Sequence, residues 1–232
     1  MILEKITRKP FAVVAHRGGT EKFPENTIAA ITHAVELGVD VVEIDVRPTK
    51  DGELILLHDP DFKRVAGVDA KPEDLSMDEI AKLSIEGQPV ATLDEALQAI
   101  GGRCGLFVEI KNPATTSQAI EKIQKSGATQ WAAIISFWEE AVQVAKEAGL
   151  FAGLVYSVPP GKIKEAKELG ADFVLPKYTI ATQKANRFAH ALGLPVVVWT
   201  VNDEAKAKEM IGRGVDAIAT DYPSQLLELR NG

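Results

Sequence analysis

Three acidic side chains interrupt two apolar segments of the sequence, and this pattern is well suited to chemistry. Glu43 and Asp45 lie in Val41–Val46, and Glu109 lies in Leu106–Ile110. Alternate side chains of a strand share a face, so Glu43 and Asp45 should point the same way. Carboxylates that converge on an apolar cavity repel one another unless a cation lies between them. The pattern therefore predicts one divalent cation, and oxygen ligands favour Mg²⁺, Ca²⁺ or Mn²⁺ over Zn²⁺.

Two histidines and two basic residues lie at the ends of apolar runs. His16 and His58 each follow such a run, and two imidazoles can divide the duties of general base and general acid. Arg17 and Lys111 add fixed positive charge beside them. Together with a metal, these cations can stabilise a phosphoryl transition state. The residue types therefore point to phosphoryl chemistry.

Simpler structural roles compete with these interpretations. Some of the acidic residues could merely pair with Arg17 or Lys111, although three carboxylates on adjacent strands are more than that role explains. His33 and His190 lie within helical patterns and are expected at the surface. Cys104 lies at the entrance to an apolar run, where we expect a small buried residue and no catalytic nucleophile.

The elements that would position these residues alternate between apolar runs and amphipathic stretches, which is typical of a parallel sheet with crossover helices. The predicted strands are Phe11–Ala15, Val41–Val46, Leu106–Ile110, Ala132–Ile135, Phe151–Tyr156, Phe173–Leu175, Val196–Thr200 and Ala217–Thr220. The predicted helices are Asn26–Leu37, Leu93–Ile100, Thr116–Lys125, Glu139–Ala148, Ile163–Leu169, Gln183–Leu192, Glu204–Ile211 and Pro223–Leu229. This pattern predicts a (β/α)₈ barrel with its reactive groups at the C-terminal ends of the strands, and an open doubly wound sheet is the alternative.

A further apolar run, Glu53–Leu57, follows the second strand too closely for a crossover helix. Asp51-Gly52 is a turn signal, so the run should return as a hairpin. A two-residue turn pairs Asp45 with His58 on one face, whereas a three-residue loop with the glycine in a bulge shifts the pairing by one. In either register His58 returns to the rim of the second strand. Pro60–Val90 is then an insertion that we expect to cap one side of the barrel mouth.

Composition limits the possible partners and the location. The 232 residues, with 46% hydrophobic and 25% charged side chains, predict a single globular domain that spans residues 1–232. A net charge of −7 disfavours nucleic acid but permits a small anionic substrate. The single cysteine allows no internal disulfide, and neither Met1–Pro10 nor any other window is a membrane span. We therefore expect a cytoplasmic protein without stable membrane association, and no feature predicts an oligomeric state.

The motifs, taken in order, resemble those of the glycerophosphodiester phosphodiesterase family. The resemblance runs nearly from end to end, and the ordered set is specific although each motif alone is weak. The matching segments are His16-Arg17-Gly18, Pro24-Glu25-Asn26-Thr27, Glu43-Ile44-Asp45-Val46, Asp51-Gly52, His58-Asp59, Thr92-Leu93, Glu109-Ile110-Lys111, Ser136-Phe137, Trp199-Thr200-Val201-Asn202 and Thr220-Asp221-Tyr222-Pro223.

The resemblance implies a TIM-type barrel that hydrolyses glycerophosphodiesters to sn-glycerol 3-phosphate and an alcohol. In the mechanism that it implies, a glycerol hydroxyl attacks phosphorus to give a cyclic phosphate, which water then opens. It also assigns roles by position. The metal ligands are Glu43, Asp45 and Glu109, the acid and base are His16 and His58, and the phosphate contacts are Arg17 and Lys111.

Five further residues of these motifs have less certain roles: two of them allow two interpretations, and three are expected to have a structural role. Glu25 can join the metal shell or contact substrate, and Asn26 is expected to be a helix N-cap. Trp199 can pack against the glycerol carbons or plug the top of the barrel. Asp59 and Asp221 are expected to be local turn and cap residues.

Three rival functions fit parts of the pattern. A lysophospholipase D, or a relative of phosphatidylinositol-specific phospholipase C, would need a membrane-facing apolar rim, whereas the insertion is largely polar. A catalytically silent barrel that only binds phosphate compounds or another protein would not need paired histidines and carboxylates. An isomerase or aldolase is supported only by Lys111, which a phosphate contact explains better.

Overall fold

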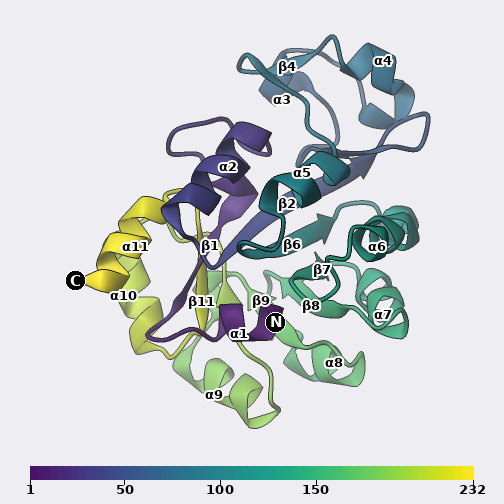
Figure 1. Ribbon diagram of the computed structural model, residues 1–232. Helices are drawn as coiled ribbons and strands as arrows, with labels where there is room; N and C mark the ends of the chain where they lie inside the picture. Colours follow the sequence, from purple (N-terminus) through teal and green to yellow (C-terminus); the bar gives the residue numbers. More distant parts are fainter.

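The computed structural model describes residues 1–232, and eight parallel strands form a nearly closed barrel with helices around it (Figure 1). Neighbours pair in the order β10-β11-β1-β2-β6-β7-β8-β9, and β9 meets β10 through the bridges Val174–Val196 and Lys177–Trp199. The predicted (β/α)₈ barrel is confirmed. The strands are β1 (Ala12–Ala15), β2 (Val41–Pro48), β6 (Gly105–Ile110), β7 (Ala132–Ser136), β8 (Phe151–Tyr156), β9 (Phe173–Pro176), β10 (Val197–Val198) and β11 (Ala217–Thr220).

Eight helices pack around the barrel and bury the outer faces of its strands. Along β2, Val42 and Ile44 belong to this outer core, whereas Val41 belongs to a second core inside the barrel. Glu43 and Asp45 alternate with the outward residues, as the period-two pattern predicts. The helices are α2 (Ile28–Leu37), α5 (Leu93–Ile100), α6 (Thr116–Lys125), α7 (Glu139–Glu147), α8 (Ile163–Glu168), α9 (Gln183–Ala191), α10 (Glu204–Gly212) and α11 (Pro223–Asn231).

A short helix that the sequence pattern did not predict, α1 (Ile2–Ile6), packs against the inner core of the barrel. Ile2 and Ile6 are fully buried there. A Cβ atom at Gly105 would come within 2.4 Å of Ile2 Cδ1, so a glycine at the start of β6 makes room for this helix.

Three aspartates tie strands together at the end of the barrel where the strands begin. Asp40, Asp172 and Asp216 each precede a strand in a Gly-x-Asp sequence. Their carboxylates accept the backbone N–H groups of Val13, Ala152 and Val196, each in or beside the strand that precedes theirs in the chain, at 2.8, 2.8 and 2.9 Å. Because these buried donors would otherwise lack partners, each aspartate fixes the register of its strand pair.

The hairpin after β2 has the three-residue register. β3 (Leu54–Leu56) runs antiparallel to β2, with Val46 opposite Leu56 and Pro48 opposite Leu54. The two-residue register was wrong, because Asp45 lies opposite Leu57 instead of His58. Backbone hydrogen bonds join Asp45 to Leu57 and Thr49 to Glu53. Hydrogen-bonded pairs alternate with non-hydrogen-bonded ones, so Pro48 lies in a non-hydrogen-bonded pair and its missing N–H costs nothing.

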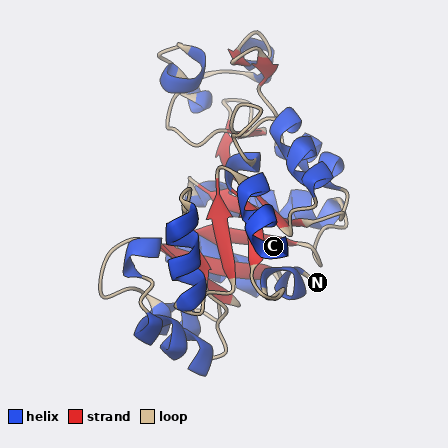
Figure 2. Ribbon diagram, turned by 90° about the vertical axis from the view of Figure 1, so that its left-hand side faces the viewer, coloured by secondary structure: helices blue, strands red, loops and turns tan.

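The insertion after the hairpin projects above the barrel at the upper end of Figure 2. It contains α3 (Lys63–Ala66), α4 (Met77–Ile80), β4 (Ser84–Ile85) and β5 (Gln88–Pro89). Its residues Phe62, Ile80, Ile85 and Val90 form a small separate core with Ile55 and Leu57 of the hairpin. No helix of the chain has both the length and the apolar character needed to cross a bilayer.

Candidate active site

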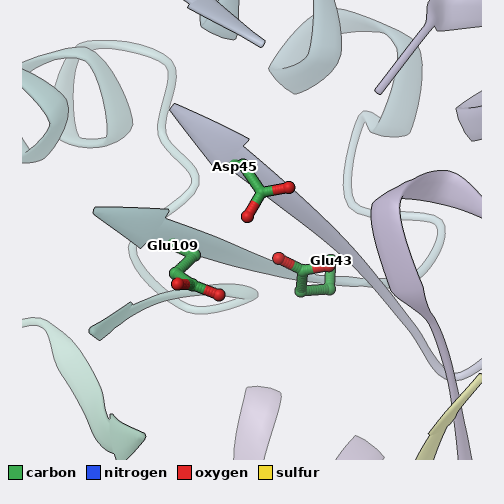
Figure 3. Close-up of side chains that lie close together, drawn as sticks. All are labelled: Glu43, Asp45 and Glu109. Atoms are coloured by element: carbon green, nitrogen blue, oxygen red, sulfur yellow. The ribbon is translucent and has the colours of Figure 1, made fainter. Parts of the chain in front are cut away.

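The three predicted acidic residues converge at the mouth of the barrel (Figure 3). Glu43 and Asp45 come from β2, and Glu109 comes from β6, where it lies directly beside Asp45. One carboxylate oxygen of each residue lies within 4.8 Å of the other two, and all three side chains are buried. The parallel register of β2 and β6 therefore produces the cluster.

Glu43 is the member of this cluster whose charge is least compensated. Its Oε2 accepts the backbone N–H of Arg17 at 2.8 Å, but its buried Oε1 has no hydrogen-bond partner. Burial, and then the charge of Asp45, raise the pKa of Glu43 above its ordinary value. An unpartnered oxygen among buried carboxylates is the environment that a hard cation stabilises, so these residues fit a divalent metal ion.

Asp45 is held in its ionised form. Burial alone would raise its pKa, but the charges of Lys111 and Arg17 lower it below the ordinary value. Lys111 Nζ lies 2.9 Å from Oδ1, and Asn26 donates from Nδ2 to Oδ2 at 2.8 Å. Lys111 Nζ also lies 2.5 Å from Glu109 Oε1, yet burial still raises the pKa of Glu109.

Asn26 is therefore not the helix cap that the sequence suggested. Its backbone has a φ of +56°, and its Oδ1 accepts the N–H of Asp45 at 3.1 Å. Thr27 caps α2 instead, because its side chain accepts the N–H of Ala30. Asn26 thus fixes the backbone and the carboxylate of Asp45 together.

His16 follows β1 and is oriented by a carboxylate from the last strand connection. Its Nδ1 lies 2.7 Å from Asp221 Oδ1, and Asp221 Oδ2 accepts Nδ2 of Asn202 at 2.6 Å. A carboxylate can only accept here, so the proton is on Nδ1 and Nε2 is left for a substrate. Burial would lower the pKa of His16, but the hydrogen bond with Asp221 and the charge of Glu43 outweigh it and raise the pKa.

His58 has the same arrangement at the end of the hairpin. Its Nδ1 lies 2.7 Å from Asp59 Oδ1, and Arg47 donates two hydrogen bonds to its backbone carbonyl at 3.0 and 3.1 Å. Here burial prevails and lowers the pKa of the imidazole. Asp59 and Asp221 are therefore partners of the two histidines and not merely turn and cap residues. The sequence offered a signal for one of them, an aspartate directly after a histidine.

Arg17 lies between the acidic cluster and the loop that leads to α2. Its φ of +53° is strained for a residue other than glycine, and this conformation accompanies the hydrogen bond from its N–H to Glu43. Its Nη1 donates to Glu25 Oε1 at 3.0 Å. Glu25 also accepts hydrogen bonds from Arg64, and its carboxylate is not among the three that converge.

A cavity of about 260 Å³ joins these groups. One wall is polar and carries both histidines, whereas the other is apolar and includes Phe137 and Trp199. Trp199 donates from Nε1 to the carbonyl of Leu175 at 2.8 Å, and its ring meets Phe137 edge to face at 5.6 Å. The polar lining residues are His16, Arg17, Glu43, His58, Glu109, Lys111 and Thr200. A larger groove of about 830 Å³, between α5 and α6, contains none of the residues that the sequence singled out for the site.

The remaining histidines and the cysteine lie elsewhere. His190 is at the surface as expected, and its Nε2 lies 2.7 Å from Asp216. His33 is half-buried against Phe23, so its predicted surface position was only partly right. Cys104 is buried, and burial raises the pKa of its thiol to about 11.

Comparison with known proteins identifies this arrangement. The sequence model of the glycerophosphoryl diester phosphodiesterase family matches residues 16–225, which include every residue of the site. The chain belongs to this family. It is therefore an enzyme, and the family resemblance of its motifs is confirmed.

Three relatives illustrate the match. A glycerophosphodiester phosphodiesterase of Caldanaerobacter subterraneus subsp. tengcongensis is 32% identical, with 94% of this chain and 96% of the relative covered. A lysophospholipase D of Rattus norvegicus is 26% identical, with 94% and 85% covered. A phosphodiesterase of Oleispira antarctica, solved in complex with the product sn-glycerol-3-phosphate, is 26% identical and superimposes with a TM-score of 0.86, with 95% of this chain and 97% of that chain covered.

Proposed function

We propose that the protein hydrolyses glycerophosphodiesters to sn-glycerol 3-phosphate and an alcohol, in a reaction that depends on one divalent cation. The observation that carries this proposal is a three-carboxylate cluster beside a cavity at the barrel mouth that is lined by two of those carboxylates, by both aspartate-paired histidines and by Arg17 and Lys111. The relative that is 32% identical bears the name of this activity. The Oleispira neighbour, whose structure contains sn-glycerol-3-phosphate, supports a product of this size.

The cation would be held by Glu43, Asp45 and Glu109. Their oxygen ligands suit Mg²⁺ or Ca²⁺, with Mn²⁺ as an alternative. When bound, the ion supplies a Lewis acid that polarises a phosphoryl oxygen and offsets negative charge in the transition state. Arg17 and Lys111 border the same cavity and would contact the phosphate as fixed positive charges.

The two histidines would carry the protons. One takes the proton of the glycerol 2-hydroxyl as its oxygen attacks phosphorus, and the other gives a proton to the alcohol as its bond to phosphorus breaks. The roles reverse when water opens the cyclic phosphate. The raised pKa of His16 and the lowered pKa of His58 favour His16 as the first acid and His58 as the first base.

The apolar wall would hold the carbon atoms of the glycerol. Trp199 fits this role because its indole N–H already has a protein partner, so its ring can cover apolar atoms. Glu25 would contribute to substrate binding through Arg17, to which it is hydrogen-bonded.

A lipid-substituted substrate is the second candidate, and a specific observation favours it. Phe137 and Trp138, in the connection after β7, are 40% and 53% exposed, and Phe137 also lines the cavity. This rim follows β7, two strands along the barrel from the β2 hairpin and the polar insertion that argued against lipids, and it could receive an acyl chain. The lysophospholipase D of Rattus norvegicus is a relative with that activity in its name.

One assay tests the proposal and separates the candidates. We expect release of glycerol 3-phosphate from glycerophosphodiesters of choline, ethanolamine, inositol or glycerol, and loss of that release in excess chelator. Mg²⁺, Ca²⁺ or Mn²⁺ should then restore it. Lysophosphatidylcholine in the same series reports the second candidate, because its hydrolysis would release choline. Full activity in excess chelator would refute the metal requirement, and no release from any water-soluble diester would refute the proposed function.

A further inference from the structure

Arg64 connects the insertion to the candidate active site. It lies on α3, and its side chain is about half exposed. Its Nε donates to Asp59 Oδ2 at 2.5 Å, while Nη1 and Nη2 donate to the two oxygens of Glu25 at 2.9 and 2.7 Å. The planar guanidinium therefore joins two carboxylates from segments 34 residues apart.

Each of these carboxylates contacts a residue of the proposed reaction. Asp59 uses its other oxygen for His58 Nδ1 at 2.7 Å, and Glu25 accepts Arg17 Nη1 at 3.0 Å. Arg64 is thus one side chain away from a candidate proton carrier and from a candidate phosphate contact. It does not line the cavity itself.

We propose that Arg64 is a positioning residue that fixes His58 through Asp59 and Arg17 through Glu25, so that the insertion forms part of the catalytic apparatus. This inference rests on the proposed function for its kinetic consequences. The geometry of the two ion pairs, however, is independent of which diester is the substrate.

The position of the other histidine shows why such a residue is needed. His16 is oriented by Asp221, and Asn202 fixes Asp221 from the connection between β10 and α10. The barrel thus supplies the support for that pair. His58 stands at the end of a hairpin above the barrel, where Arg64 supplies the corresponding support for Asp59. The main cause of the low pKa of Asp59, about 2, is its hydrogen bond with Arg64.

An arginine suits this position better than a lysine. The guanidinium presents its N–H groups in a fixed plane, so it can bind Glu25 with two parallel bonds and still reach Asp59. A lysine is a point charge and would keep one carboxylate at a time. Arg64→Lys should therefore retain the positive charge but lose most of the positioning.

The first test compares two substitutions on α3. Arg64→Met should lower kcat/KM for glycerophosphocholine by about 10- to 100-fold, the usual cost of removing a residue that orients a ligand or catalytic group. Lys63→Met is the matched control, because Lys63 pairs with Asp69 at 3.0 Å and both side chains are exposed. The control should stay within about twofold of the parent. Thermal melting of both variants shows whether folding is intact. If Arg64→Met unfolds, Arg64→Lys replaces it in the same comparison, because it keeps the charge but should lose most of the positioning.

A second test asks whether the effect passes through His58. In a His58→Ala background, Arg64→Met should lower kcat much less than in the parent, because the residue being positioned is absent. Guanidinium ion, added to an Arg64→Ala variant, should restore part of the lost rate because the half-exposed position is accessible. The same fold loss in both backgrounds, with no rescue by guanidinium, would overturn the inference.

A third test does not depend on activity. ¹⁵N NMR of the four histidines should show His58 protonated on Nδ1 in the parent, and Arg64→Met should give a mixture of the two neutral tautomers. An unchanged His58 tautomer in the variant would contradict the positioning role. If the parent does not hydrolyse any glycerophosphodiester, the proposed function fails, while this measurement still decides the role of Arg64.

Discussion

Substitution of Glu43 tests the electrostatic description of the acidic cluster. Burial and the charge of Asp45 raise the pKa of Glu43 from 4.5 to about 8. The ionised carboxylate therefore destabilises the metal-free protein, and Gln at this position removes the charge. A glutamine can still accept the N–H of Arg17 through its amide oxygen, so the fold should remain intact.

The size and sign of the effect follow from linkage. Each unit of pKa corresponds to about 1.4 kcal/mol, so the shift is worth roughly 3 to 5 kcal/mol as an upper limit, because the neighbouring carboxylates titrate with Glu43. This loss of folding stability is absent below the pKa of Glu43 in the unfolded chain, about 4.3, and grows as the pH rises toward 8. Metal-free Glu43→Gln should therefore be more stable than the parent at pH 8 and similar to it near pH 4.5.

Asp45→Asn is a matched control with the opposite sign. The pKa of Asp45 is lowered because Lys111 and Arg17 outweigh burial, so its charge stabilises the fold above pH 4. Its removal takes one buried partner from Lys111 and one from Arg17, which keep Glu109 and Glu25, and should cost up to about 3 kcal/mol at all pH values from 5 to 8.

Urea unfolding of both variants and the parent, in excess chelator between pH 4.5 and 8, measures these differences. In millimolar Mg²⁺ the stability advantage of Glu43→Gln over the parent should shrink, because a ligand that binds only the folded state stabilises most the protein that binds it better. If Glu43→Gln is less stable than the parent in chelator at pH 8, the account of carboxylate repulsion is wrong.

Two other predictions concern the site and the fold. Asp221→Asn should lower kcat by about 10- to 100-fold and move the alkaline limb of its pH profile to lower pH, since Asp221 raises the pKa of His16; an unchanged profile would argue against His16 as the acid. Asp172→Ala should lower the free energy of unfolding by about 1 to 3 kcal/mol, because the buried N–H of Ala152 loses its acceptor and Lys146 its ion pair; a urea midpoint equal to that of the parent would show that this aspartate does not stabilise the strand pair.

The sequence predicted the barrel well because its signals are local. Strand β8, helix α5 and helix α6 have the bounds that apolar periodicity indicated. The parallel alignment of β2 with β6 then places Asp45 beside Glu109 without further information. This is why the acidic cluster could be predicted from two strand patterns.

The features that sequence patterns missed depend on contacts between distant segments. Helix α1 is short, and its apolar residues have meaning only against the interior of the barrel. The partnership of Asp221 with His16 spans 205 residues, and no local pattern marks it. The hairpin register, by contrast, is local: the sequence left two loop lengths open, and in the observed one Pro48 lies where no N–H is needed. The cytoplasmic location and the single-domain boundaries stay predictions.

The most direct test of the proposed mechanism is the rate of His16→Ala and His58→Ala with two kinds of leaving group. With glycerophosphocholine, each variant should lose about 10² to 10⁴ in kcat. With a glycerol nitrophenyl phosphodiester, whose leaving group needs no proton, His16→Ala should lose far less, whereas His58→Ala should lose nearly as much as before. If both variants hydrolyse glycerophosphocholine within about threefold of the parent, a change smaller than any general acid or base contribution, the two-histidine mechanism is contradicted.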